Sequence, residues 1–215
     1  TTGAVNIRAS SGGANSDDAD PTYGDGLITL IAEVVGSVSV EVNPSTLTAD
    51  GASPATVTAT VLNSDGSPVN AGTSVTFTTS AGVLDTDPSF TNPQISVTTS
   101  TGFSGAASVS LRSSTTAGQY FVTATAGGRS GAAQVNFIAG LADAGNSTLT
   151  VSPATIPADG SSTAIMTLTA QDSIGNPVAD GKTVGFTAND PGVVISNQTT
   201  TVAGVARATL TSTNT

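Results

Sequence analysis

The sequence VNPSTLTADG at residues 42–51 recurs as VSPATIPADG at residues 151–160. A second pair, GSPV at 66–69 and GNPV at 175–178, lies downstream at the same offset of 109 residues (151 − 42 and 175 − 66). Each copy then continues into a Gly-x-x-Val-x-Phe segment, at residues 72–77 and 181–186. Equal spacing over this distance is a signature of tandem domains.

Short segments in which apolar residues alternate with Thr, Ser or other polar residues surround these motifs. Residues 55–62 alternate in this way and stop at a turn sequence, Asn63-Ser64-Asp65-Gly66, and similar segments follow at 73–79, 94–100, 106–112 and 119–126. Thr and Val suit a half-buried pleated strand, and Gly accepts the positive φ of a tight turn. No segment shows sustained helical periodicity. The pattern predicts an all-β protein built from antiparallel β-sandwiches.

The composition excludes several classes of function. The 215 residues include no Cys and no His, so a Ser-His-Asp or Cys-His catalytic site, an imidazole metal ligand, a disulfide and a structural zinc site are all excluded. Five basic residues face 15 acidic ones, for a formal net charge of −10, which argues against nucleic acid as a partner. The longest apolar run, 27–42, is interrupted by Glu33 and Glu41, so direct membrane insertion is not expected. We therefore expect no enzyme.

The order V-x-P-x-T-x-x-A-D-G, an alternating strand, and then G-x-P-V-x-x-G-x-x-V-x-F resembles the bacterial immunoglobulin-like domains of group 1. Those domains are the tandem modules of invasin- and intimin-type surface adhesins. The resemblance continues through residues 105–111 and 117–125, and it covers one complete unit and most of a second. It implies tandem immunoglobulin-like antiparallel β-sandwiches on a bacterial cell surface.

The positions at which the repeats begin and end divide the chain into three predicted parts. Residues 37–140 form a complete immunoglobulin-like domain, and residues 141–215 form a domain that lacks its last strand or strands. Residues 1–36 supply the closing strands of a partial domain, because 3–9 resembles the penultimate strand of the complete unit and 28–36 resembles its segment 120–128. The connection at 139–146 is rich in Gly and Ala, so we expect bending there.

Three functions are compatible with this organisation. The first is a non-catalytic spacer in the stalk of an extracellular bacterial adhesin, whose partners are the neighbouring immunoglobulin-like domains. The second is a filament subunit, in which the leading strands of one copy complete the trailing domain of an identical copy. The third is a carbohydrate-binding or virion-appended module, although the sequence identifies neither a glycan nor a host-surface ligand.

The acidic segment at residues 15–26 is a candidate calcium site. No other cofactor is expected. Asp17, Asp18, Asp20 and Asp25 lie close together in a stretch that also offers Gly and backbone carbonyls. Oxygen ligands of this kind are those that Ca²⁺ prefers, although the spacing does not match an EF-hand. The alternative is a solvated acidic loop.

Two further carboxylate motifs have structural interpretations. Asp50-Gly51 and Asp159-Gly160 occupy the same place in both units and are predicted to shape a turn. Asp85 and Asp87 would share one face of a strand, but the surrounding residues are Thr, Ser and Pro, and the chain has no Trp to stack on a sugar as in a glycosidase site. Phe77, Phe121 and Phe137 fall in alternating strands and are predicted to lie in the core or at a domain junction.

The calcium hypothesis makes a direct prediction about thermal stability. If Asp17, Asp18, Asp20 and Asp25 bind Ca²⁺, the ion stabilises the folded state by mass action and raises the melting temperature as its concentration increases. A thermal melt in a calcium titration, with magnesium as the control ion, measures this effect. An unchanged melting temperature identifies a solvated acidic loop instead.

Overall fold

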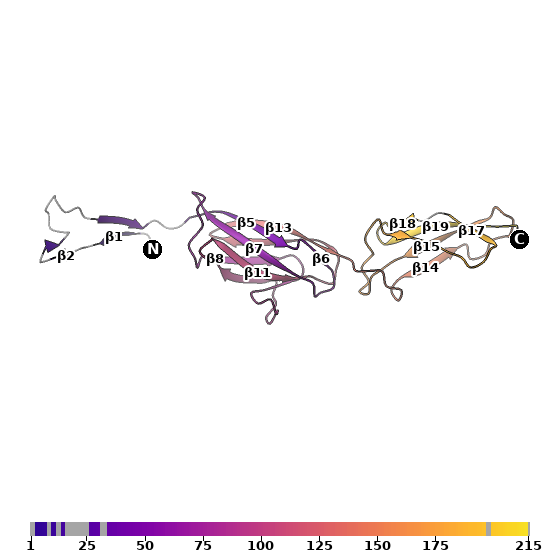
Figure 1. Ribbon diagram of the computed structural model, residues 1–215, viewed down its shortest axis with the longest axis horizontal. Helices are drawn as coiled ribbons and strands as arrows, with labels where there is room; N and C mark the ends of the chain where they lie inside the picture. Colours follow the sequence, from indigo (N-terminus) through magenta and orange to yellow (C-terminus); the bar gives the residue numbers. More distant parts are fainter. Residues whose placement is uncertain are drawn as a thin grey trace.

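The computed structural model describes residues 3–7, 10–11, 14–15, 26–30, 34–196 and 199–214. These residues form strands, turns and loops without any helix, as the alternating segments predict. Two β-sandwiches follow one another along the long axis, the first built from residues 35–138 and the second from residues 148–212 (Figure 1).

The N-terminal strands form two short ladders. β1 (Gly3–Ile7) pairs antiparallel with β4 (Gly26–Leu30), and β2 (Ser10–Ser11) pairs antiparallel with β3 (Ala14–Asn15). The direct pairing of β1 with β4 differs from the sequence comparison, which matched them to segments that lie in opposite sheets of the first sandwich. Alternation identifies a strand but not its partner, so the assignment of residues 1–36 to a partial domain stays a prediction.

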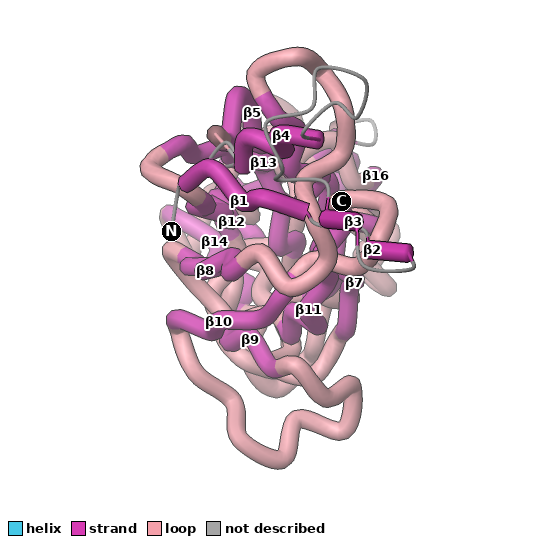
Figure 2. Tube along the Cα trace, turned by 90° about the vertical axis from the view of Figure 1, so that its left-hand side faces the viewer, coloured by secondary structure: helices cyan, strands magenta, loops and turns pink. Residues whose placement is uncertain are grey.

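The first sandwich consists of two sheets. One has the order β5-β7-β11-β9 and the other the order β10-β8-β12-β13-β6, and Figure 2 shows β7 and β11 on one side of the molecule with β8 and β12 on the other. All pairings are antiparallel except that of β6 with β13. The strands are β5 (Val35–Asn43), β6 (Thr46–Thr48), β7 (Pro54–Asn63), β8 (Ser74–Thr79), β9 (Val83–Asp85), β10 (Ser96–Ser100), β11 (Ala106–Arg112), β12 (Gly118–Ala126) and β13 (Arg129–Ile138).

Alternation along β7 explains how the core forms. Ala55, Val57, Ala59 and Val61 are buried, whereas the Thr residues between them face outwards. β7 lies between β5 and β11, so that Val57 pairs with Val42 on one side and Val109 on the other. The sheet thus presents a continuous apolar face to its partner sheet.

Two aromatic residues fill the centre of this core. Phe77 in β8 is fully buried and Phe137 in β13 is 2% exposed, as expected for core residues. The ring of Tyr120 lies 5.0 Å from that of Phe137, tilted by 43°. Phe121 differs from the expectation, because it is 52% exposed. It follows Tyr120 directly in β12, and neighbouring residues of a strand point to opposite faces.

The second sandwich has a four-stranded sheet of order β14-β15-β19-β17 and a two-stranded sheet of β16 and β18. The strands are β14 (Thr148–Ser152), β15 (Thr163–Thr169), β16 (Thr183–Val184), β17 (Val193–Ile195), β18 (Thr199–Thr200) and β19 (Val205–Ser212). Their order repeats β5-β7-β11-β9 and the β8–β10 pair of the first sandwich. Among the described residues, nothing in the second sandwich corresponds to β12 and β13.

Stability of the first sandwich should depend on Phe137 and much less on Phe121. Phe137→Ala leaves a cavity in a closed core and should lower the free energy of unfolding by about 3–5 kcal/mol. Phe121→Ala is the matched control on the neighbouring strand, and because its side chain is half exposed we expect a loss below about 1 kcal/mol. Chemical unfolding followed by circular dichroism measures both values. Equal losses for the two variants would contradict this assignment of the core.

Candidate functional site: the junction between the sandwiches

A single asparagine of the second sandwich binds the backbone of the first. The side-chain amide of Asn176 donates from Nδ2 to the carbonyl oxygen of Thr115 at 2.9 Å, and its Oδ1 accepts from the backbone N–H of Ala117 at 2.9 Å. Asn176 is only 7% exposed. Two hydrogen bonds from one planar amide fix both the distance and the orientation of the loop that it contacts.

A buried carboxylate holds this asparagine and the linker together. Asp172 is 2% exposed, and its Oδ2 accepts from the backbone N–H of Gly140 at 2.9 Å and from Nδ2 of Asn176 at 3.0 Å. Its Oδ1 accepts from the backbone N–H groups of Ile174 and Asn176 at 2.9 and 2.8 Å. Asp172 therefore orients Asn176 and anchors the chain segment that leaves the first sandwich.

The charge of Asp172 is balanced by hydrogen bonds. Burial disfavours the ionised form, but the bonds from the side chain of Asn176 and from the backbone N–H groups of Gly140, Asn176 and Ile174 outweigh it. Together they lower the pKa of Asp172 from 3.8 to about 2. The group is therefore a carboxylate at neutral pH, and all its bonding partners are donors.

The linker between the sandwiches is tied to the second sandwich along its length. The backbone N–H of Asp143 donates to the carbonyl oxygen of Gln171 at 2.7 Å, and Nδ2 of Asn146 donates to the carbonyl oxygen of Asp172 at 3.0 Å. Oδ2 of Asp143 in turn accepts from the backbone N–H of Asn146 at 3.0 Å. The bending expected at 139–146 is therefore opposed by specific hydrogen bonds, which the Gly- and Ala-rich composition did not reveal.

The loop at 172–176 owes its shape to a turn that both sandwiches share. The backbone N–H of Gly175 donates to the carbonyl oxygen of Asp172, and Gly66 donates in the same way to Asn63 in the first sandwich. Both glycines have positive φ, 94° and 86° respectively. The side chains differ, however, since the positions of Asp172 and Asn176 are occupied by Asn63 and Ser67. This departure from the repeat is the sequence signal that could have identified the junction residues.

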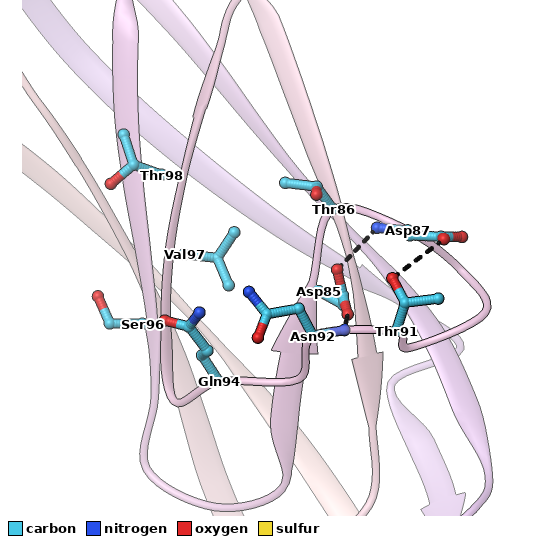
Figure 3. A pocket seen from close by; sticks show the side chains of 9 residues that line it. All are labelled: Asp85, Thr86, Asp87, Thr91, Asn92, Gln94, Ser96, Val97 and Thr98. Atoms are coloured by element: carbon cyan, nitrogen blue, oxygen red, sulfur yellow. Dashed lines mark hydrogen bonds between the residues drawn. The ribbon is translucent and has the colours of Figure 1, made fainter.

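A second polar site lies beside the connection between β9 and β10 (Figure 3). Its hollow of about 420 Å³ is lined by Thr, Ser, Asn and Gln side chains together with Asp85, Asp87 and Val97. Asp85, 3% exposed, accepts from the backbone N–H groups of Asp87 and Asn92 at 3.0 and 2.7 Å, and these bonds lower its pKa. Asp87 accepts from the backbone N–H of Ser89 at 2.8 Å. Both carboxylates thus shape the loop, and the pKa of Asp85 moves opposite to that of a general acid.

The repeated Asp-Gly pairs shape turns, as predicted. Oδ1 of Asp50 accepts from the backbone N–H groups of Ala52 and Ser53 at 2.8 and 2.7 Å, and Gly51 has a φ of 72°. Asp159 makes the same two bonds, to Ser161 and Ser162 at 2.9 and 2.6 Å. The hydroxyl of Ser113, just after β11, also donates to Asp50, and the hydroxyl of Ser212, at the end of β19, donates to Asp159. These bonds connect each turn to a strand of the sheet.

The candidate calcium ligands Asp17, Asp18, Asp20 and Asp25 lie outside the described residues, so calcium binding stays a prediction. Within the part of the chain that the structure describes, no group of three or more Asp, Glu, His or Cys side chains is placed to hold a metal ion. None of the described residues belongs to a helix of the length and hydrophobicity that crossing a membrane requires.

The chain matches the family described as invasin, domain 3, over residues 33–140 and again over residues 143–215. These matches cover well over half of its length, and the chain therefore belongs to this family of immunoglobulin-like adhesin modules. The resemblance to invasin- and intimin-type modules and the all-β sandwich fold are both confirmed.

Solved structures agree with this family. Invasin, described as a bacterial integrin-binding protein, has a TM-score of 0.74 at 26% identity, over 100% of this chain and 41% of invasin. InvD of Yersinia pseudotuberculosis has a TM-score of 0.63 at 22% identity, over 82% of this chain and 49% of InvD. FdeC, an Escherichia coli adhesin, has a TM-score of 0.50 at 20% identity, over 99% of this chain and 66% of FdeC. The chain thus spans less than half the length of the invasin and InvD chains that it matches.

Replacing the buried carboxylate of Asp172 should lower the stability of the second sandwich and weaken its hydrogen bond to the linker at Gly140. Asp172→Asn substitutes a donor for one of the acceptor oxygens, which leaves a buried N–H without its partner and costs about 1–3 kcal/mol. Hydrogen exchange of the amides of β15 and β19 measures the loss. Asp65→Asn, in the equivalent loop of the first sandwich, is the control and should leave β15 and β19 unchanged. Equal protection in wild type and Asp172→Asn would contradict the anchoring role.

The stabilisation from Asp172 should also depend on pH in a defined direction. Because its pKa is lowered in the folded state, the carboxylate stabilises the fold fully above a pH of about 4. That contribution is lost as the pH falls from about 4 towards 2. The difference in unfolding free energy between wild type and Asp172→Asn should therefore shrink over this interval. A difference that stays constant down to the lower limit would rule out the carboxylate as its source.

Proposed function

We propose that this chain is a non-catalytic spacer of a bacterial surface adhesin, in which the sandwiches are held in a fixed relative orientation. The observation that carries the proposal is the junction, where Asn176 binds the loop 115–117 and Asp172 binds Gly140. A flexible tether would place the linker in solvent, whereas here the linker and both flanking loops share hydrogen bonds. The family membership supports an extracellular location on the bacterial cell surface.

A non-catalytic role agrees with the chemistry of the chain. The sequence has neither His nor Cys, and Asp85 and Asp87 are engaged in holding their loop. The partners that the junction supports are the neighbouring immunoglobulin-like modules themselves. For a spacer, the quantity under selection is the distance and direction between its ends, and a hydrogen-bonded junction controls both.

Distance measurement between spin labels tests this proposal. The sequence contains no native Cys, so Ala132→Cys and Thr163→Cys place one label on an exposed position of each sandwich. The wild-type junction should give a narrow distance distribution in double electron–electron resonance. Asn176→Ala removes the amide that contacts the first sandwich and should broaden the distribution clearly.

Two further variants distinguish the loss of the junction contacts from unfolding of the loop at 172–176. The triple variant Asp172→Asn, Ile174→Asp and Asn176→Ser gives this loop the sequence of residues 63–67, which folds with the same turn in the first sandwich. It should keep the second sandwich folded while broadening the distances. Ser67→Ala alters the position equivalent to Asn176 at the far end of the first sandwich and should change nothing. A broad distribution in the wild-type chain would refute the fixed-orientation spacer.

A further inference from the structure

The strand β10 is an open edge of the five-stranded sheet in the first sandwich. It pairs with β8 on one side, and among the described residues no strand pairs with it on the other. Its sequence, Ser-Val-Thr-Thr-Ser at 96–100, contains neither a charged residue nor a Pro. Charged residues and Pro are common means by which proteins prevent another strand from adding to an edge. β10 therefore lacks these protections against a further strand.

The other described edges of this sandwich are shorter or covered. β6 and β9 have three residues each. β5 is longer, but β13 approaches it so closely that a side chain at Gly131 would collide with the carbonyl oxygen of Val38. Among the edges that the structure describes in the first sandwich, β10 is thus the one on which a strand can be added.

Backbone hydrogen bonds show which groups of β10 are free. The carbonyl oxygen of Ile95, just before the strand, accepts from the N–H of Thr79 at 3.0 Å. The N–H of Thr101, just after the strand, donates to the carbonyl oxygen of Thr73 at 2.9 Å. Because these groups alternate in direction along an antiparallel strand, every second residue from 95 to 101 faces β8. The backbone groups that point away from the sheet belong to Ser96, Thr98 and Ser100.

The polar hollow of about 420 Å³ lies directly beside this edge (Figure 3). One of its walls is the start of β10, residues 96–98, and the other is the segment 85–92. Val97, half-buried against the core, lies between the two walls, whereas its neighbours on the strand are exposed. Side chains of a strand added to β10 alternate in the same way, so that every second one enters the hollow.

The hollow carries negative charge without a cationic partner. Asp85 and Asp87 both line it, and neither forms an ion pair with any described residue. Arg112, on the neighbouring strand β11, lies over the ring of Phe90 at 4.6 Å instead. Asp87 binds the backbone through Oδ1, while its Oδ2 accepts only a long bond of 3.4 Å from the hydroxyl of Thr91. That oxygen can accept a charge-assisted hydrogen bond from an ammonium or guanidinium group.

We propose that β10 is a docking site for an extended segment of a partner protein that carries a Lys or Arg side chain. The segment adds antiparallel to β10 and binds the outward backbone groups of Ser96, Thr98 and Ser100. Its basic side chain lies opposite Val97, with the apolar stem against Val97 and the charged group at Asp87. This site is separate from the junction and goes beyond the spacer function.

A labelled heptapeptide in which Thr and Lys alternate tests the proposal against the full chain. Fluorescence anisotropy should show saturable binding with one peptide per chain. Hydrogen exchange measured by NMR should slow about tenfold or more at the amides of Ser96, Thr98 and Ser100. The amides of Val97 and Thr99 already face β8 and should not change. Protection confined to other residues, or no binding at all, overturns the proposal.

N-methylated peptides distinguish strand addition from attraction between charges. With the Lys side chains towards the hollow, the N–H groups of the Thr residues face β10 and those of the Lys residues face solvent. The peptide N-methylated at its Thr residues should therefore lose binding. The peptide N-methylated at its Lys residues has the same charge and should bind as the parent does. Equal binding by these two peptides overturns the proposal.

Variants of the chain separate the strand edge from its charge. Thr98→Pro removes an outward N–H, leaves the ladder with β8 in place and should abolish binding, with circular dichroism as the check on folding. Asp87→Asn keeps an oxygen for the N–H of Ser89 but removes the charge, and should weaken binding about threefold. Asp65→Asn changes the net charge equally in a distant loop and should have no effect. Equal effects of the two Asn substitutions contradict the assigned place of the basic group.

Sedimentation velocity of the chain without peptide covers pairing between two copies. If β10 of one copy pairs with β10 of another, the chain dimerises and the amides of Ser96, Thr98 and Ser100 are protected before any peptide is added. That result overturns the proposal, because the occupant is then a second copy of this chain. We expect a chain that does not dimerise through β10 and whose three outward amides exchange freely until the peptide binds.

Discussion

The ladder between β12 and β13 is the interaction on which the first sandwich depends. β12 continues the sheet to β8 and β13 continues it to β6, so this hairpin occupies the middle of the five-stranded sheet. Its inward side chains, above all Phe137, complete the core against the opposite sheet. Gly140, two residues beyond the end of β13, donates a hydrogen bond to Asp172. The element that closes one core is thus also the start of the junction to the next sandwich.

Four aspartates among the described residues bind the backbone of their own loops. Asp50, Asp85, Asp159 and Asp172 each accept at least two backbone N–H groups, and in every case these bonds contribute to a lowered pKa. These bonds give the N–H groups of the loops an acceptor within the protein in place of water, and so hold the loops in one shape. The formal charge of −10 therefore reflects in part how the connections between strands are built, and it does not by itself indicate a cationic ligand.

Much of the fold could be predicted from the sequence, because its determinants are local. The alternation of residues 55–62 gives the strand and its buried face, and the Asp-Gly pairs give the turns. The junction could not be predicted, because Asn176 meets Thr115 only after two separate sandwiches have formed. The pairing of β1 with β4 could not be predicted for a related reason, since strand partners are decided by the whole sheet. The exposure of Phe121 follows from its position next to Tyr120, because only one of two neighbouring strand residues can face the core. The difference between Ser67 and Asn176 at equivalent positions was visible in the sequence, but its meaning depends on which loop comes to lie against it.

The parallel pairing of β6 with β13 has a mechanical consequence. The chain enters the first sandwich along β5 and β6 and leaves it along β13, so traction on the two ends pulls β6 and β13 in opposite directions along their shared ladder. The backbone bonds joining Asn136–Ile138 to Thr46–Thr48 are then loaded in shear and must rupture together, instead of unzipping singly. Tension along the chain therefore loads this short ladder in shear, which gives a three-residue strand an importance far beyond its size.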